Sequence, residues 1–419
     1  MPDNSLKGAQ TGDYLGKLQI NVTSSLGLIP IPDATVTISY TGVPDVTIER
    51  LNTDSSGQTE EIELPTPPLE YSVEPNEQMP YSEYNIQVDA PGYESVMISG
   101  TELLPDVTAI QPIRMTPIET AEEEEETIVI PGHTLYEEYP PKIPEDEIKP
   151  MDESGEIVLS RVVIPEFIVV HDGVPDDTTA ANYYVRYRDY IKNVVSSEVY
   201  ATWNENALYA NTLAIMSFTL NRVYTEWYRN KGYNFTITSS TAYDQKWMYG
   251  RNIYANIDRI VDSIFANFLS RPGVRQPIFT AYCDGRRVTC DGLSQWGSQY
   301  LANEGYTPIE IIRYYYGNDM YINSADSISG VPSSWPGYNL SIGSSGEKVR
   351  QMQQQLNRIA QNYPVIPVIS TDGIYGPATA EAVRTFQRIF NLPQTGVVDY
   401  PTWYSISNIY VGVSRIAEP

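Results

Sequence analysis

Several residue types that mark common functional classes are scarce in this chain of 419 residues. Only two Cys and two His are present, too few for a disulfide-built scaffold or a His-rich metal site. Lys and Arg number 27 against 53 Asp and Glu, which gives a formal net charge of −26. Proteins that follow nucleic-acid phosphates or dock on anionic lipid need a cationic surface, so neither partner is expected. No run approaches the ~18 consecutive apolar residues of a membrane span, and residues 1–17 lack the apolar core of a signal peptide, so routine secretion is not expected.

Tyrosine, by contrast, is abundant, with 33 Tyr against 8 Phe. A Tyr ring has an apolar face and a polar tip, which suits stacking on sugars or lining a wet interface. The alternative is that Tyr takes the place of Phe in the core. The length predicts two to four domains, each with its own core.

Much of the negative charge lies in one short segment. Residues 119–156 contain 14 acidic residues against Lys142 and Lys149, and so carry a net charge of −12. Five prolines fall in the same segment, and both like-charge repulsion and proline oppose helix and sheet. Residues 117–160 are therefore predicted to form an extended, exposed linker. Because proteases cut exposed flexible segments, the linker is also a candidate processing site, within about residues 117–150.

Residues 17–116, before the linker, have the period of short β-strands. Leu18, Ile20 and Val22 alternate with polar residues, and turn sequences such as DSSG and APGY separate the runs. About seven short strands predict a β-sandwich over residues 1–116. The motifs PDATVTI, TDSSGQT and VDAPGYESV resemble the prealbumin-like domain, which implies a spacer or regulatory role.

The apolar period becomes helical after the linker, which predicts a mainly helical α+β domain over residues 161–330. A β-prone run, Ile278 to Tyr282, interrupts the helices. The helices are predicted at residues 183–195, 206–230, 251 to about 269, 298–303 and 307–316.

Residues 338–410 form a separate helical pattern. The motifs GSSGEKVRQMQQQLN, DGIYGPATAEAVRTFQ and LPQTGVVDYPTW follow one another over about 65 residues. Their order and spacing resemble the single-repeat peptidoglycan-binding domain of cell-wall hydrolases. The resemblance implies a three-helix domain and peptidoglycan as partner, and completes a multidomain α+β fold class.

The loop between the first two of these helices holds the candidate peptidoglycan-binding residues. Asp372 and Gly373 set a tight turn, and Tyr375 and Gly376 follow at once. An exposed Tyr in a groove would be a platform for sugar or stem peptide. The alternative is that these four residues only hold the fold together.

Glycan cleavage needs a carboxyl group that stays protonated near neutral pH, which partial burial achieves by raising its pKa. Glu198 follows the apolar stretch NVVSS and precedes the start of the next helix, so it is the candidate acid. The alternative is a solvated Glu at a helix end.

Two segments resemble the stage II sporulation protein D family of lytic transglycosylases, and together they cover roughly residues 185–318. They read DYIKNVVSSEVYATWNENALYANTLAIMSFTLNRVY and YCDGRRVTCDGLSQWGSQYLANEGYTPIEIIRYYYG. The resemblance implies that Glu198 is the catalytic acid and base and that Ser294 and Gln295 lie in the loop facing it. Tyr282 is a further candidate for substrate binding.

The chain departs from the family at one position. Members often carry Gly-His-Gly where this chain reads VTCDG, so any role of that His is in doubt here. Cys283 and Cys290 lie on the same loop, and free thiols, a disulfide and a metal site are all open for them. His171 would reach them only through the fold, and two thiols fall short of a zinc ligand set, so no metal or cofactor is predicted.

The whole order resembles the clostridial spore cortex-lytic enzymes, which are made as proenzymes and cut by subtilisin-like germination proteases. The resemblance implies a spore protein, lying outside or within the cortex and made without a signal peptide, whose N-terminal region is removed on activation. The implied reaction cleaves the bond between muramic acid and glucosamine and gives a 1,6-anhydro product. The alternative is a catalytically degenerate, peptidoglycan-binding coat protein. Amidase activity is associated with the class, but no zinc-amidase ligand set is present.

Overall fold

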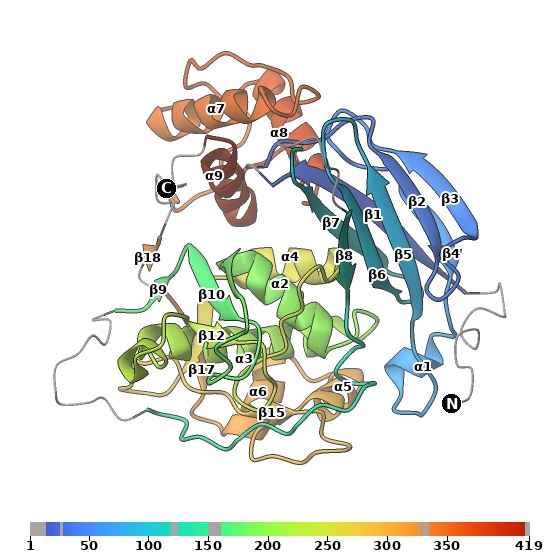
Figure 1. Ribbon diagram of the computed structural model, residues 1–419. Helices are drawn as coiled ribbons and strands as arrows, with labels where there is room; N and C mark the ends of the chain where they lie inside the picture. The colour runs from blue at the N-terminus through green and yellow to red at the C-terminus, as the bar shows by residue number, and fades with distance from the viewer. Residues whose placement is uncertain are drawn as a thin grey trace.

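The computed structural model describes residues 14–25, 28–118, 125–149, 161–325, 327–329 and 335–414. These residues build a β-rich N-terminal part, a mixed central part and a helical C-terminal part (Figure 1). Within these ranges, no helix combines the length and apolar composition that a bilayer crossing requires.

Two sheets form the N-terminal part. The first has the order β3-β2-β5-β6-β8 and the second the order β13-β7-β1-β4. Their strands are β1 (Leu15–Ser24), β2 (Thr35–Tyr40), β3 (Thr47–Asn52), β4 (Ile62–Pro65), β5 (Ser82–Asp89), β6 (Ser95–Leu103), β7 (Thr108–Met115), β8 (Glu125–Val129) and β13 (Ile253–Tyr254), with the short helix α1 (Glu70–Val73) after β4.

The predicted alternation along the first strand is confirmed. Leu18, Ile20 and Val22 point inward from β1 and are fully buried, and Val36 and Ile38 do the same from β2. Since successive side chains of a strand point to opposite faces, this period puts one apolar face of each sheet into a shared core.

Two strands of these sheets come from outside the N-terminal part. β8 lies in the acidic segment and pairs in parallel with β6, and β13 lies in the central part and pairs with β7. The residues around β13 also bind Glu102 of β6: Arg251 forms an ion pair of 2.5 Å with its carboxylate, and Asn252 bonds its backbone at both N–H and C=O. Both charged side chains are buried. The N-terminal and central parts are therefore joined by a sheet and by a buried ion pair.

Removing one member of this pair should destabilise the protein strongly. Glu102→Gln leaves the Arg251 guanidinium buried without its counter-charge, for which a loss of about 3–5 kcal/mol in the free energy of unfolding is expected. Denaturant titration measures the loss. The control is Glu61→Gln, because Glu61 pairs with Lys17 in the open, with side chains 41% and 45% exposed, and should cost less than ~1 kcal/mol. Equal effects would contradict the prediction.

The central part surrounds a long buried helix, α3. The small sheet β11-β10-β12 and three two-stranded pairings accompany the helices. The elements are β9 (Val163–Ile164), β10 (Phe167–His171), β11 (Asn182–Arg186), α2 (Tyr187–Glu198), α3 (Glu205–Tyr224), a 3₁₀ turn (Arg229–Lys231), β12 (Ile237–Thr238), α4 (Ala255–Ile264), β14 (Asn267–Ser270), β15 (Tyr282–Cys283), β16 (Leu293–Ser294), α5 (Gln295–Asn303), α6 (Pro308–Tyr316), β17 (Tyr321–Ser324) and β18 (Ser327–Ile328).

Helices were expected at these places, but three of them are shorter than predicted. The helix expected at 206–230 ends at Tyr224, and the other two lose residues to strands. Residues 183–186 belong to strand β11, where the run Tyr-Tyr-Val favours a strand over a helix. Residues 267–270 form β14, which pairs with β17 some 54 residues later in the chain. In both cases pairing with a distant strand overrides a helical period. The expected helix at residues 307–316 is confirmed, since Thr307 and Glu310 form a capping box at its start.

The described part of the acidic segment is extended, as its composition predicts, but it packs on the central part, so many of its residues are only partly exposed. After β8, residues 131–149 run as an extended strap across one face of the central part (Figure 1). His133 and Lys149 are buried within this strap, and Leu135 is 8% exposed. Residues 119–124 and 150–160, where much of the predicted linker falls, lie outside the described residues.

Three helices make up the C-terminal part, as predicted: α7 (Glu347–Ala360), α8 (Pro377–Ile389) and α9 (Tyr400–Ser414). This part contacts both of the others. Gln58 donates to the Ile389 carbonyl and Tyr363 to the Leu28 carbonyl. Asn391 donates to Asp258 of the central part. Each of the three parts therefore contacts the other two.

Candidate active site

Glu198 is the last residue of α2, and its side chain is buried, with the residue 3% exposed. Its Oε1 accepts a hydrogen bond of 2.8 Å from the backbone N–H of Lys246. Among the described residues, neither its Oε2 nor the Tyr282 hydroxyl has a hydrogen-bond partner of standard geometry. The two groups lie beside each other, because the Tyr282 hydroxyl interacts with the Glu198 carboxyl, and together they form a small buried polar pair.

A cavity of about 320 Å³ opens onto Glu198. The sequence-predicted Tyr282 and Gln295 line it together with Glu198, so three of the predicted residues meet. The rest of the lining comes from the strap, from Thr241 and from the loop after β15, with Thr134, Glu138, Tyr139, Pro140, Pro141, Lys142, Cys283, Asp284, Arg287 and Val288.

The environment of Glu198 favours the protonated acid. Burial raises the pKa of the Glu198 carboxyl above its ordinary value of 4.5, and the opposing effects of the Lys142 ammonium, the Tyr282 hydroxyl and the Lys246 N–H do not cancel the rise. Lys142 is partly buried, and burial lowers its pKa, against the attraction of Glu198 and Asp244. The site therefore contains a carboxyl poised to give up a proton, with one cation of the strap beside it.

Neighbouring side chains fix the backbone on both sides of Glu198. Gln295 Nε2 donates to the Glu198 carbonyl at 3.1 Å. Asn193, one turn earlier on α2, both donates to and accepts from Met248, which ties the helix to the segment carrying Lys246. Gln295 thus acts as a positioning residue for the candidate acid.

Ser294 is not part of the cavity, contrary to its expected place in substrate binding. Its hydroxyl caps α5 by accepting from the Gly297 N–H at 2.9 Å. This cap explains a Ser at the position. Gln295, one residue later, is the one of the two that bonds the Glu198 carbonyl.

The two cysteines form a disulfide, Cys283–Cys290, which resolves the three alternatives left open for them. The bond closes the loop that carries Asp284 and Arg287 at the cavity wall. His171 takes no part, because it bonds Asn182 and the Val174 carbonyl and stacks on Phe235. No group of three or more His, Cys, Asp or Glu that could hold a metal occurs within the described residues.

The candidate peptidoglycan-binding loop differs from its prediction in one respect. Tyr375 is 1% exposed and donates its hydroxyl proton to the Gly396 carbonyl, so it is not an exposed platform. Asp372 accepts from the Ile374 N–H and Gln353, and Gly373 has φ of +77°, which favours Gly. Gly376 is the residue before α8. These contacts support the alternative reading, in which the four residues hold the three helices together.

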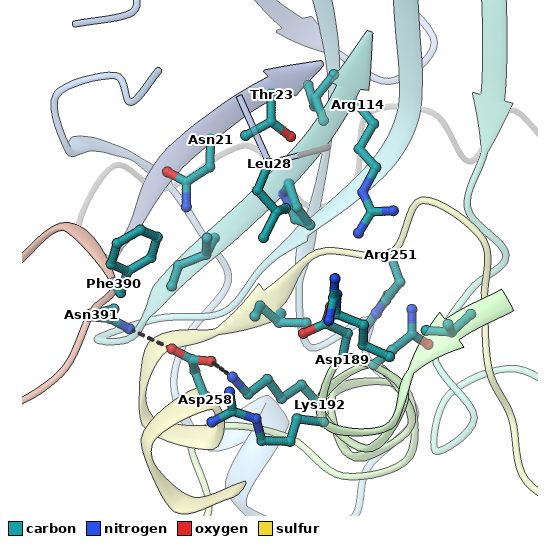
Figure 2. Close-up of a pocket in the computed structure, with 18 of the residues that line it drawn as sticks. Asn21, Thr23, Leu28, Arg114, Asp189, Lys192, Arg251, Asp258, Phe390 and Asn391 are labelled. Atoms are coloured by element: carbon teal, nitrogen blue, oxygen red, sulfur yellow. Dashed lines mark hydrogen bonds and ion pairs between the residues drawn. The ribbon is translucent and has the colours of Figure 1, made fainter. Parts of the chain in front are cut away.

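A second, larger cavity lies where the three parts meet (Figure 2). It measures about 540 Å³, and Arg114 points into it from β7. Lys192 at its floor is bonded to Asp258 at 2.5 Å and to Asp262 at 2.9 Å. Arg188 also pairs with Asp262 at 3.1 Å, so two cations face these two carboxylates, and the cavity lies at an interface between parts.

Arg287 shows how the site and the strap are connected, and sequence reasoning missed it. Its guanidinium donates to the backbone carbonyls of Thr134, Tyr136 and Glu137 at 2.8–3.0 Å. Three bonds to main-chain carbonyls carry no sequence signature in the strap. In the sequence, the only indication of this contact was the motif GRR, which places two arginines on a Gly-containing loop.

Models of known protein families match the central and the C-terminal parts of the chain separately. A family model described as a stage II sporulation protein matches residues 176–264, and one described as a peptidoglycan binding domain matches residues 345–406. The stage II sporulation domain is associated with peptidoglycan lytic activity. The pair of domains is that of a cell-wall-acting sporulation protein. No curated protein sequence matches the chain significantly.

Three solved structures each resemble a fragment of it. The Bacillus anthracis TIE protein is 14% identical over 25% of this chain and 17% of its own length, with a TM-score of 0.18. The minor pilin GBS52 of Streptococcus agalactiae is 13% identical over 26% and 47%, with a TM-score of 0.19. Catechol 1,2-dioxygenase from Acinetobacter is 12% identical over 30% and 61%, with a TM-score of 0.18. This chain thus covers less than two thirds of each of these proteins. TM-scores this low support no conclusion about the fold or function of this chain.

The raised pKa of Glu198 predicts a pH-dependent stability. A carboxyl whose pKa is higher in the folded state contributes stability fully below its ordinary value of 4.5 and loses it as pH rises through the folded pKa. Glu198→Gln removes the titration, so the variant should gain stability over the parent chain as pH rises from about 4.5 to 8. Thermal unfolding at several pH values measures this. The exposed Glu304→Gln is the control, expected to differ from the parent by less than ~0.5 kcal/mol; a constant Glu198→Gln difference would contradict the prediction.

Proposed function

We propose that the chain is the proenzyme of a spore cortex lytic transglycosylase. The observation that carries the proposal is a single buried carboxyl, Glu198, which has a raised pKa and lines a cavity. Glu198 gives its proton to the glycosidic oxygen between muramic acid and glucosamine as that bond breaks. The carboxylate then takes the proton of the muramic 6-hydroxyl, whose oxygen attacks the anomeric carbon to give the 1,6-anhydro ring.

One carboxyl is sufficient for this reaction, because the nucleophile belongs to the substrate and is already held near the reacting carbon. The other carboxylate that the central part contributes to the lining, Asp284, is engaged elsewhere. It accepts from the N–H groups of Arg286, Arg287 and Val288. Burial raises the pKa of Asp284, but these hydrogen bonds outweigh it and the pKa is lowered overall. Asp284 therefore shapes the loop and is unsuited to hold a proton near neutral pH.

The strap supports the proposal that activation is proteolytic. It supplies nearly half of the cavity lining and places Lys142 beside Glu198, where a substrate would have to lie. A cut within residues 150–160 would leave the entire strap on the N-terminal fragment, whereas a cut within residues 119–124 would leave it on the central part. We therefore place the activating cut of a subtilisin-like germination protease after Lys149, at or just beyond the C-terminal end of the range 117–150 expected from the sequence.

Product analysis tests the reaction. A chain with a specific protease site inserted within residues 151–160 is nicked, incubated with cortex sacculi, and the released muropeptides are analysed. Anhydro-muramic ends are expected, and Glu198→Gln should reduce them by about 10²–10⁴-fold, the usual contribution of a general acid. Equal release by Glu198→Gln would sink the assignment. Retention on sacculi without any release would favour the alternative of a degenerate, peptidoglycan-binding coat protein, which the C-terminal domain match supports.

Loosening the strap should raise the activity of the uncut chain. Arg287→Ala removes three hydrogen bonds to strap carbonyls, so we expect faster sacculus digestion without proteolysis. Arg286→Ala is the matched control, because the neighbouring Arg286 bonds Asn76 and Glu77 of the N-terminal part and not the strap. No increase for Arg287→Ala, or the same increase for both variants, would show that the strap does not restrain the enzyme.

A further inference from the structure

Two acidic residues of the strap are paired with arginines of the central part. Glu145 binds Arg222 through both oxygens, at 2.6 and 2.9 Å, and Glu147 binds Arg271 in the same way, at 2.5 and 2.8 Å. Two-pronged contacts of this kind are the geometry in which a guanidinium recognises a carboxylate. The face beneath the strap thus holds two guanidinium groups, those of Arg222 and Arg271, that each bind a carboxylate through two hydrogen bonds. These two groups are called forks below.

Each fork is held in place by the central part itself. Arg222 Nε donates to Asp244 at 2.7 Å, and Arg271 donates to Asp319 and to the Tyr316 carbonyl. These partners do not leave with the strap. The arginines therefore stay oriented when the strap is gone, with the sides that held Glu145 and Glu147 free.

Aromatic rings connect the forks to Glu198. Tyr282, Phe218 and Phe279 follow one another with ring-centroid separations of 6.2 and 4.5 Å. Two strap lysines cover these rings: Lys142 Nζ lies 4.8 Å from the Phe218 centroid, and Lys149 Nζ lies 3.8 Å from that of Phe279. Aromatic faces of this kind also suit the apolar faces of sugars.

We propose that the strap occupies a binding groove for the peptidoglycan strand, in which Arg222 and Arg271 take the carboxylates of the peptide stems. The groove runs from Glu198 past Phe218 and Phe279 to Arg271. In this proposal Glu145 and Glu147 occupy the positions of the stem carboxylates, and Lys142 and Lys149 cover the rings along which the glycan passes. This inference rests on the proposed function, since it assigns the substrate contacts of the same site.

Substitutions at the ion pair of Glu147 with Arg271 distinguish two roles for Arg271: binding the substrate, or only anchoring the strap. Glu147→Gln and Arg271→Gln break the same pair and should loosen the strap equally. Only Glu147→Gln leaves the fork intact for substrate. Arg271 is chosen over Arg222 because it is partly exposed, with 23% of its side chain accessible, whereas Arg222 is buried and its loss endangers folding.

Affinity for a soluble disaccharide-peptide from peptidoglycan is measured by calorimetry on the full chain, in the Glu198→Gln background so that the probe survives. Glu147→Gln should bind about tenfold tighter than its parent, equivalent to ~1.4 kcal/mol, and Arg271→Gln should show no gain. The gain should vanish with the same disaccharide lacking its peptide. Arg275→Gln is the control, an exposed arginine nearby that makes no strap contact among the described residues.

Equal gains for both variants, or no gain for Glu147→Gln, would overturn the inference, and thermal unfolding confirms that each variant is folded. The readout is binding and needs no turnover. A nicked chain that makes no anhydro ends would therefore refute the proposed reaction. The difference in affinity between Glu147→Gln and Arg271→Gln would still test the binding groove independently.

Discussion

The structure depends on keeping one carboxyl group away from water. Glu198 is buried at the end of α2 with a single backbone hydrogen bond, and a buried carboxyl is costly unless it stays protonated or gains partners. The neighbouring ties, from Gln295 to its carbonyl and from Asn193 to the facing segment, hold this unfavourable arrangement rigidly. Burial raises the pKa of Glu198, so the feature that weakens the fold is the one that suits it for proton transfer.

Local patterns in the sequence were enough for the elements with a clear period. The alternation in β1, the capping box of α6 and the apolar stretch before Glu198 each follow from residues close in sequence. The position of Glu198 was inferred from a resemblance, since a Glu at a helix end is by itself uninformative. The same resemblance implied that Gln295 faces Glu198. That Tyr282 also lies beside Glu198 is visible only in the fold.

The strap could not be predicted, because its charge is balanced by distant residues. Glu145 and Glu147 meet arginines 77 and 124 positions later, so a segment that repels itself locally is neutralised by tertiary contacts. β13 was hidden for a similar reason, since two residues give no period and their pairing partner lies in another part. Tyr375 was misplaced because a Tyr at a tight turn has no pattern that separates burial from exposure.

The pairing of β13 with β7 has a consequence for what a protease can achieve. The N-terminal part is held by this strand, by the buried ion pair of Glu102 with Arg251 and by its contacts with the C-terminal helices. Cutting one peptide bond breaks none of them. The cut only turns an intramolecular contact into a bimolecular one, and so removes the high effective concentration that keeps the fragments together. The delay between cleavage and full activity would then be set by the dissociation rate of two folded fragments, and dilution would make their separation irreversible.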